Sequence, residues 1–258
     1  MKAIWKGSIG FGLVNIPVKL YSATQTSTLD LDMLDRRDKA RIRFERVNEN
    51  TRKEVPWGNI VKGYYYKDDY VVLEEDDFAE AAPEKSKLIE ITQFVKEEEI
   101  DSILFENPYY VEPEKNGKRA YGLLREALKK SGKVGIATFI LRTKEILASI
   151  KPAGNVLVLN KLRFHEEVRS TDELELPGAK DVKPAELKMA LTLIDQFTEK
   201  FNPARYKDEY SNELLKIIKA KASGKRATVR KITTAPKKTR DLMEQLKASL
   251  STGRKRAS

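Results

Sequence analysis

Apolar and polar residues alternate over the first part of the chain, which is the pattern of a strand with one buried face. The apolar positions of this alternation are Val14, Ile16, Val18 and Leu20. The pattern predicts strand over residues 4–21. Pro17 cannot donate a ladder hydrogen bond, so we expect it at a sheet edge or a bulge.

Short runs of β-branched and aromatic residues predict further strands. They lie at 70–73, 88–95, 109–111, 133–142, 146–151 and 155–163, and the alternation Arg-Ile-Arg-Phe at 41–44 predicts another. Short helices are expected at about 75–81 and 97–104. A longer helix follows Gly117 and ends at Gly132. Its single apolar stripe consists of Ala120, Leu123, Leu124, Ala127 and Leu128.

The spacing becomes helical after Pro177. Apolar residues recur every three or four positions from Pro184 to Phe201, where Asn202-Pro203 ends the helix, and again over about 208–221. Many short strands followed by two helices indicate an α+β fold that is mainly β. The pattern leaves open a β-barrel or a sandwich, either with a helical appendage.

Beyond Ser223 the chain is rich in Lys, Arg, Thr and Ala, and we expect it to be largely disordered. One amphipathic segment, 241–250, interrupts it with Leu242, Met243, Leu246 and Leu250. A helix of ~10 residues is marginal in water, so we expect this segment to fold on a partner; the alternative is a last helix packed on the body. The expected domains are a core at 1–178, a helical arm at 179–222 and a basic tail at 223–258.

Composition excludes much of enzymology. The 258 residues include no cysteine and one histidine, His165, which rules out disulfides, thiolate metal sites, cysteine nucleophiles and two-histidine sites within one chain. No window approaches 18 consecutive apolar residues, and the first residues lack the apolar run of a signal peptide. We expect a cytoplasmic protein with no membrane partner.

Positive charge is concentrated at the end of the chain. Residues 219–258 hold 13 of the 49 Lys and Arg residues and two acids, which leaves 36 basic and 37 acidic residues in 1–218. A near-neutral body with a cationic tail favours a polyanionic partner, and the alternative is a merely solubilising tail. The tail cations expected to contact nucleic acid are Lys225, Arg226, Arg230, Lys231, Lys237, Lys238, Arg254, Lys255 and Arg256.

A second concentration of charge, called here the basic cluster, lies within eleven residues. Its members are Arg36, Arg37, Lys39, Arg41, Arg43 and Arg46, with Asp38 and Glu45 as the only acids between them. If 41–46 is a strand, Arg41 and Arg43 project from one face toward a phosphate backbone; the alternative is an edge strand blunted by charge. No motif that reads DNA or RNA bases accompanies the cluster, so sequence-independent binding is expected.

Nothing in the sequence supports catalysis. The glycines at 7, 10 and 12 lack the spacing of a phosphate loop and are interpreted as a turn. No nucleophile motif accompanies His165. The acidic clusters 74–77 and 97–99, the only support for a metal-dependent nuclease, fall at helix starts, where carboxylates offset the helix dipole. We expect no enzyme activity, no metal and no cofactor.

Three ordered sequence blocks resemble the bacterial Ku proteins. They are KAIWKGSI at 2–9 with GLVNIPVKLY at 12–21, then KPAELKMA at 183–190, then FNP at 201–203 followed by Tyr206, Asp208 and Tyr210. The similarity runs from residue 1 to about 222.

The resemblance implies a homodimeric ring that threads onto double-stranded DNA ends during non-homologous end joining and recruits an ATP-dependent end-joining ligase, at the bacterial nucleoid. It implies a Ku-like β-barrel core with an arching, DNA-encircling insertion, and a helical arm that reaches over the partner subunit. The basic cluster is then expected on the arch, with Lys19 and Arg142 as further DNA contacts and 241–250 as the ligase-docking segment. The alternative is a sequence-independent DNA-coating or nucleoid-associated protein that binds through its tail.

One loop departs from the family pattern. Many bacterial Ku proteins carry a Cys-x-x-Cys pair after the RIRxxR stretch, which suggests a metal knuckle. Asn48 and Thr51 stand at those positions here. We therefore expect the chain to need no zinc, and the sequence leaves open how the loop is held.

Overall fold

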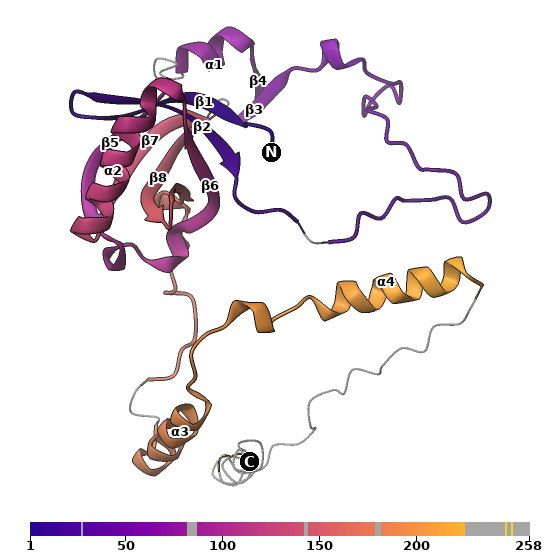
Figure 1. Ribbon diagram of the computed structural model, residues 1–258. Coiled ribbons are helices and arrows are strands. Elements are labelled where there is room, and N and C mark those ends of the chain that lie inside the picture. Colours follow the sequence, from indigo (N-terminus) through magenta and orange to yellow (C-terminus); the bar gives the residue numbers. More distant parts are fainter. Residues whose placement is uncertain are drawn as a thin grey trace. The chain divides into compact units, whose positions relative to one another are not determined.

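The computed structural model of the chain describes residues 1–26, 28–81, 87–141, 144–178 and 182–224, together with positions 246 and 249. The chain divides into two units, Met1–Thr26 with Leu31–Arg169, and Ser27–Asp30 with Ser170–Ser258. The first unit contains the sheets, and the second contains the helices α3 and α4 (Figure 1).

The first two strands form a hairpin. β1 (Trp5–Phe11) pairs antiparallel with β2 (Val14–Ser22) along its whole length. Gly12 in the connecting turn has φ +56°, a left-handed conformation that glycine adopts without steric cost. Gly12 therefore lies in the turn between the two strands, as the sequence predicts, whereas the turn predicted at Gly7 and Gly10 was wrong, because both residues are paired within β1.

Pro17 lies inside β2, which is not an edge strand because the sheet closes on itself. The Pro17 carbonyl accepts a hydrogen bond from the Glu114 nitrogen at 2.9 Å, so the Pro17 nitrogen also faces the strand β6 (Phe105–Pro113). Pairing between β2 and β6 begins one residue later, at Val18↔Pro113. The missing N–H thus falls just outside the ladder, where no donor is required.

Seven strands close a barrel in the order β1-β2-β6-β9-β8-β7-β5. The strands not yet introduced are β5 (Leu88–Lys96), β7 (Lys133–Leu141), β8 (Lys144–Ala153) and β9 (Val156–Leu162). Neighbours are antiparallel except β1 and β5, whose parallel pairing closes the sheet. Closure removes the free sheet edges. Of the two folds that the sequence pattern left open, the structure is therefore the barrel and not the sandwich.

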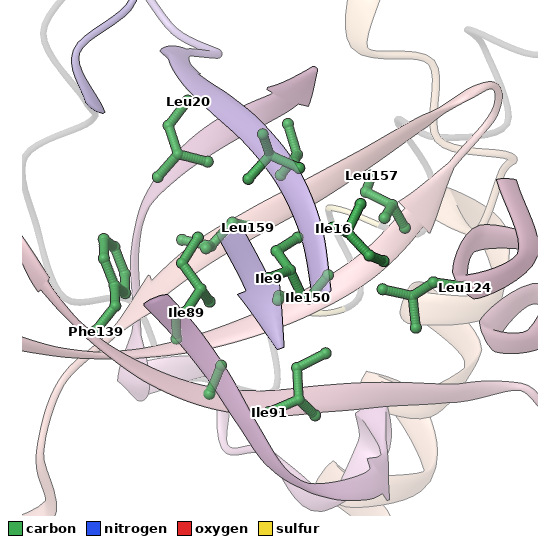
Figure 2. Close-up of a cluster of buried hydrophobic side chains, with 14 of the residues drawn as sticks. Ile9, Ile16, Leu20, Ile89, Ile91, Leu124, Phe139, Ile150, Leu157 and Leu159 are labelled. Atoms are coloured by element: carbon green, nitrogen blue, oxygen red, sulfur yellow. The ribbon is translucent and has the colours of Figure 1, made fainter. Parts of the chain in front are cut away.

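The inward side chains of the strands fill the barrel with one apolar core. Figure 2 shows Ile9, Ile16, Leu20, Ile89, Phe139, Ile150, Leu157 and Leu159 converging there, all of them buried. Full burial of one such side chain contributes about 1.5–3 kcal/mol. The alternation in β2 therefore places Ile16, Val18 and Leu20 in this core, as its period predicts.

The helix α2 (Lys118–Ser131) packs on the barrel (Figure 1). Its buried residues are Tyr121, Leu124 and Leu128, whereas Leu123 is 65% exposed and Ala127 is exposed as well, so the predicted stripe was wrong at these two positions. The Tyr121 hydroxyl explains why the buried face of α2 differs from the predicted stripe. It donates to the Val111 carbonyl at 2.8 Å and accepts from the Leu157 nitrogen at 2.7 Å, which fixes α2 to β6 and β9.

Two short turns replace the helix expected at 97–104. They are η2 (Glu97–Glu99) and η3 (Ser102–Leu104). The Asp101 carboxylate accepts from the Ile103 nitrogen at 3.0 Å, which starts a new turn and interrupts any continuous helix. Two similar turns, η4 (Lys115–Gly117) and η5 (His165–Glu167), precede α2 and follow β9.

Between β2 and β5 the chain makes a long excursion from the barrel. It contains the turn η1 (Trp57–Asn59), the hairpin of β3 (Lys62–Tyr66) and β4 (Asp69–Leu73), and the helix α1 (Glu75–Ala81). β3 was not predicted from the sequence, because its KGYYY run does not alternate and all five residues are exposed.

The second unit contains α3 (Pro184–Phe197), the turn η7 (Pro203–Arg205) and α4 (Glu209–Ala222). α3 ends four residues before the predicted Phe201. The β-branched Thr198 leaves the helix with ψ 112°, and its hydroxyl donates back to the Ile194 carbonyl at 2.8 Å. The Asp208 carboxylate caps α4 by accepting from the Ser211 nitrogen at 2.9 Å. None of the helices described has the length and hydropathy needed to span a bilayer.

Candidate nucleic-acid interface

The basic cluster lies in the first part of the excursion, before η1. A narrow turn carries it, with an isolated bridge between Leu34 and Arg41 and a hydrogen bond of 2.9 Å from the Ile42 nitrogen to the Met33 carbonyl. Lys39 adopts φ +65° in the turn. Every residue from 36 to 46 is exposed.

The predicted strand at 41–46 is not formed. Residues 42–46 take part in no ladder, and the next isolated bridge joins Val47 to Glu54. The physical reason is that alternating cations repel one another and that no apolar face is buried to fix a register. Arg41 and Arg43 are therefore presented by irregular backbone, without the strict face that a strand would give them.

Three cations of the cluster have local partners. Arg37 pairs with Asp35 at 2.8 Å, and its hydrogen bonds hold the pKa of the Asp35 carboxyl below its ordinary value. Arg41 pairs with Asp32 at 2.5 Å, and the Lys39 ammonium donates to the Arg36 carbonyl at 2.7 Å. These contacts shape the turn and reduce the charge available to a ligand.

The other three cations, Arg36, Arg43 and Arg46, form no ion pair with any described carboxylate. The Arg46 guanidinium instead lies over the ring of Trp57, 4.7 Å from its centroid. Unpaired and exposed guanidinium groups are the usual donors to phosphate oxygens. The guanidinium groups of this part of the chain can therefore bind the backbone phosphates of a nucleic acid.

The loop that follows is held by hydrogen bonds. The Asn48 side-chain oxygen accepts from the nitrogens of Asn50 and Thr51 at 3.0 and 2.9 Å, which is an Asx turn. Backbone hydrogen bonds across the loop join Asn48 to Lys53 and to Arg52, and join Arg46 to Val55. The residue at the first cysteine position thus closes the loop by hydrogen bonding.

Comparison with known proteins identifies the family. A family model described as the Ku70/Ku80 beta-barrel domain matches residues 10–189. The chain belongs to the Ku family.

Three curated relatives, each named non-homologous end joining protein Ku, match almost the whole chain. The protein of Coxiella burnetii is 43% identical, over 96% of this chain and 94% of its own length. Those of Bacillus subtilis and Archaeoglobus fulgidus are 41% and 39% identical, each over 97% of this chain and over 82% and 98% of their own lengths. A solved SPOC domain of human PHD-finger protein 3 aligns at a TM-score of 0.32 and 12% identity, over 63% of this chain and 97% of its own. The resemblance to Ku that the sequence blocks carried is confirmed.

Two further predicted DNA contacts of this Ku-family chain, Lys19 and Arg142, stay predictions. Lys19 lies on β2 of the barrel, half-buried, with its ammonium 4.0 Å from the Glu114 carboxylate. It is not part of the segment that carries the basic cluster. Arg142 lies outside the described residues, and so do the nine predicted tail cations.

The predicted partner-docking segment is described at two positions. Leu246 and Ser249 are helical, and Leu246 is half-buried. Leu242, Met243 and Leu250 lie outside the described residues. The role of 241–250 remains a prediction.

The acidic clusters of the chain take the positions expected of helix-start residues. Glu75, Asp76 and Asp77 form the first turn of α1, and Glu97–Glu99 form η2. Within the ranges described, no three carboxylate or imidazole groups are placed to hold a metal ion. The exposed His165 lies in η5, where its carbonyl accepts from the Val168 nitrogen.

A cavity of about 810 Å³ on the barrel was not anticipated from the sequence. Tyr21, Tyr110, Glu112, Lys118 and Arg125 are among its lining residues. The Tyr21 hydroxyl donates to the Glu112 carboxylate at 2.6 Å, and this hydrogen bond raises the pKa of Tyr21. The Arg125 guanidinium donates to Glu126 and to the Asn155 carbonyl. Glu112 and Arg125 are thus already paired within the chain.

An exposed aromatic surface was also missed. Tyr64, Tyr65, Tyr66 and Tyr70 of the hairpin β3–β4 are each more than half exposed, and Trp57 just before it is 72% exposed. Tyr65 and Tyr70 are cross-strand partners whose rings meet edge to face at 5.2 Å. The signal in the sequence was the concentration of aromatic residues in 57–70, which periodicity alone does not register.

Proposed function

We propose that this chain is a non-enzymatic Ku protein that binds double-stranded DNA ends as a homodimeric ring during non-homologous end joining. In this proposal the excursion between β2 and β5 is the arch that faces the duplex. The ring recruits and stimulates an ATP-dependent end-joining DNA ligase.

The observation that carries the proposal is the form of the basic cluster. Six cations lie on an exposed, irregular segment inserted into a closed barrel of the Ku family. Phosphate contacts supply affinity and orientation without sequence information. A ring that recognises an end by threading needs this kind of contact and no base readout.

Exposed apolar surface supports the homodimer. On α3, Leu187, Leu191 and Ile194 follow one another at helical spacing, and each is about half exposed or more. A two-stranded sheet such as β3–β4 is marginal by itself, and its tyrosines are exposed as well. Contiguous exposed apolar residues of this kind mark interaction surfaces. In the proposal a second copy of the chain covers them.

The test is a gel-shift with one duplex in two forms, linear and covalently closed, at about 150 mM salt, where non-specific phosphate binding is weakened. A threaded ring requires a free end, so we expect binding to the linear form and little binding to the closed circle. Adding a circle cut once by a restriction enzyme restores an end in the same sequence and serves as the matched control.

The opposite result has a definite meaning. Equal binding to the linear and closed forms would contradict threading and would favour the DNA-coating alternative. The 13 basic residues of 219–258 are the observation that keeps this alternative open.

A further inference from the structure

Among the described residues, a single aromatic ring contacts a cation of the basic cluster, at the base of the 46–57 loop. The Arg46 guanidinium carbon is 4.7 Å from the centroid of the Trp57 ring. The described part of the chain contains two other cation–π contacts, Lys62 over Phe78 and Lys67 over Tyr66, and neither involves a cation of the cluster. Arg46 is therefore held in a way that its five neighbours in the cluster are not.

The loop backbone brings the two side chains together. The Val55 nitrogen donates to the Arg46 carbonyl at 2.7 Å, and Val47 and Glu54 form a bridge. Trp57 follows Pro56, whose carbonyl accepts from the Asn59 nitrogen at 2.9 Å to start η1. The ring position is thus set by backbone hydrogen bonds at both ends of the loop.

Stacking on a ring orients a guanidinium without using its donors. All five N–H groups of arginine lie in the plane of the guanidinium, so a ring beneath that plane leaves them free. An exposed arginine otherwise loses considerable rotamer freedom when it binds a phosphate, and an ordered side chain has lost part of that freedom already. Arg46 is consequently the cation of the cluster best prepared for a phosphate contact.

We infer that Trp57 is a positioning residue, which presents the edge of the Arg46 guanidinium to a backbone phosphate of duplex DNA. The inference rests on the proposed function and adds a role to it. Trp57 acts through Arg46, so its contribution to DNA affinity disappears when Arg46 is absent. A direct stacking contact between Trp57 and DNA would not disappear in that way.

The test is a double-mutant cycle on the full chain, with affinity for a blunt linear duplex measured at several salt concentrations. Trp57→Leu is expected to weaken binding by about 2- to 5-fold, the range of an exposed cation–π contact. Trp57→Phe keeps a ring under the guanidinium and should restore most of the affinity. Arg46→Gln should weaken binding further and lower the salt slope, and Trp57→Leu added to Arg46→Gln should cause no additional loss.

The matched control is Tyr66→Leu, which removes the exposed ring beneath Lys67 in the neighbouring hairpin. Its effect should add to that of Arg46→Gln without coupling. Thermal melts of each variant identify any that unfold. Effects of Trp57→Leu and Arg46→Gln that add in full would overturn the positioning role, and so would an unchanged affinity of Trp57→Leu.

Fluorescence gives a second, independent readout, because the chain has two tryptophans. In a Trp5→Phe background only Trp57 reports, and duplex DNA at Arg46 should shield it from acrylamide quenching. Quenching that is unchanged by saturating duplex would contradict the inference. Absence of duplex binding by the unmodified chain would instead refute the proposed function itself.

Discussion

Tyr121 shows how much of the barrel depends on one hydroxyl group. It is 5% exposed and links the Val111 carbonyl to the Leu157 nitrogen, two groups on different strands. Tyr121→Phe leaves both backbone groups buried without this partner, so we expect a loss of about 1–3 kcal/mol in the free energy of unfolding. Urea denaturation measures it. Tyr110→Phe, on the more exposed β6 position, is the control and should change stability by less than half as much.

The same residue predicts a dependence of stability on pH. Burial raises the pKa of Tyr121 above its ordinary value of 10.0, because the interior disfavours the phenolate. The neutral form therefore stabilises the fold below pH 10, and this contribution is lost as the pH rises through the raised pKa of the folded state. Urea midpoints of the unmodified chain should fall more steeply above pH 10 than those of Tyr121→Phe, and parallel curves would argue against it.

Arg43 is the simplest test of phosphate binding by a single side chain. It is exposed and forms no ion pair with a described carboxylate, whereas Arg41 is tied to Asp32. Arg43→Gln should weaken binding alike on duplexes of different sequence and reduce the salt slope by about 1. Arg205→Gln, which removes an exposed cation paired with Glu199, should leave the slope unchanged. A loss that depends on base sequence would mean that Arg43 reads bases.

At the residue scale the sequence shows which cations belong to the basic cluster, but it does not show which of them form ion pairs within the chain. The acids Asp32 and Asp35 flank the basic cluster, and only the turn geometry assigns them to Arg41 and Arg37. Trp57 is eleven positions from Arg46, a separation that would keep the two side chains roughly 16 Å apart along a helix and farther apart along a strand. Such contacts depend on the path of an irregular backbone, which residue patterns do not determine.

The loop at 46–57 is closed by hydrogen bonds between its own residues. Asn48→Ala removes the acceptor of two backbone N–H groups, so we expect local opening to become about 2- to 10-fold more frequent while the barrel keeps its stability. Hydrogen exchange at residues 48–55 measures this. Asn50→Ala keeps the backbone donor and should behave like the unmodified chain. Metal chelators should change neither exchange nor DNA binding, and a chelator-sensitive loop would show that a metal does hold it.

A substitution on the exposed apolar face of α3 tests the proposed homodimer. Leu191 and Ile194 of α3 are 52% and 60% exposed, which is unusual for neighbouring aliphatic residues in a helix. Ile194→Glu places a charge in the surface proposed to be covered by a second copy, where it would be desolvated without a partner. We expect the sedimenting species to shift from dimer to monomer, with weaker binding to DNA ends. Lys188→Glu on the same helix is the control, and a dimer that survives Ile194→Glu would exclude this face.

Elements were predicted well wherever burial imposes a period. β2 follows its alternation because one of its faces is in the core, whereas β7, β8 and β9 were predicted from continuous apolar runs, which are buried on both faces. The pattern failed at 41–46 and at β3, where every residue is exposed and nothing selects a register. α3 ends at Phe197 because the backbone of Thr198 turns to ψ 112°, an early end that helical spacing does not anticipate.

At the scale of the whole molecule, the closed barrel required information that no single strand contains. The parallel pair of β1 and β5 joins strands separated by the entire excursion, and alternation alone could not choose it over a sandwich. The family resemblance of the three sequence blocks supplied that choice. The role proposed for the excursion rests on its position in the chain, since it leaves the barrel between β2 and β5.

Two segments near the end of the chain lead to different predictions. The 13 basic residues of 219–258 should add non-specific affinity, whereas 241–250 is proposed to dock the ligase. Deleting 241–250 removes one basic residue, Lys247, so DNA end binding should change by less than about 2- to 3-fold at a salt slope of roughly 1 per contact. Stimulation of the ligase should be lost.

A matched deletion separates the two roles. Removing 225–240 takes away Lys225, Arg226, Arg230, Lys231, Lys237, Lys238 and Arg240 and leaves the amphipathic segment intact. This variant should bind DNA more weakly and with a smaller salt slope, yet still stimulate the ligase once enough protein is added to saturate the ends. The two deletions therefore have opposite effects if the segments have separate partners. Equal loss of ligase stimulation in both, at saturating protein, would mean that the ligase responds to the charge of the tail and that the apolar residues of 241–250 do not form its docking site.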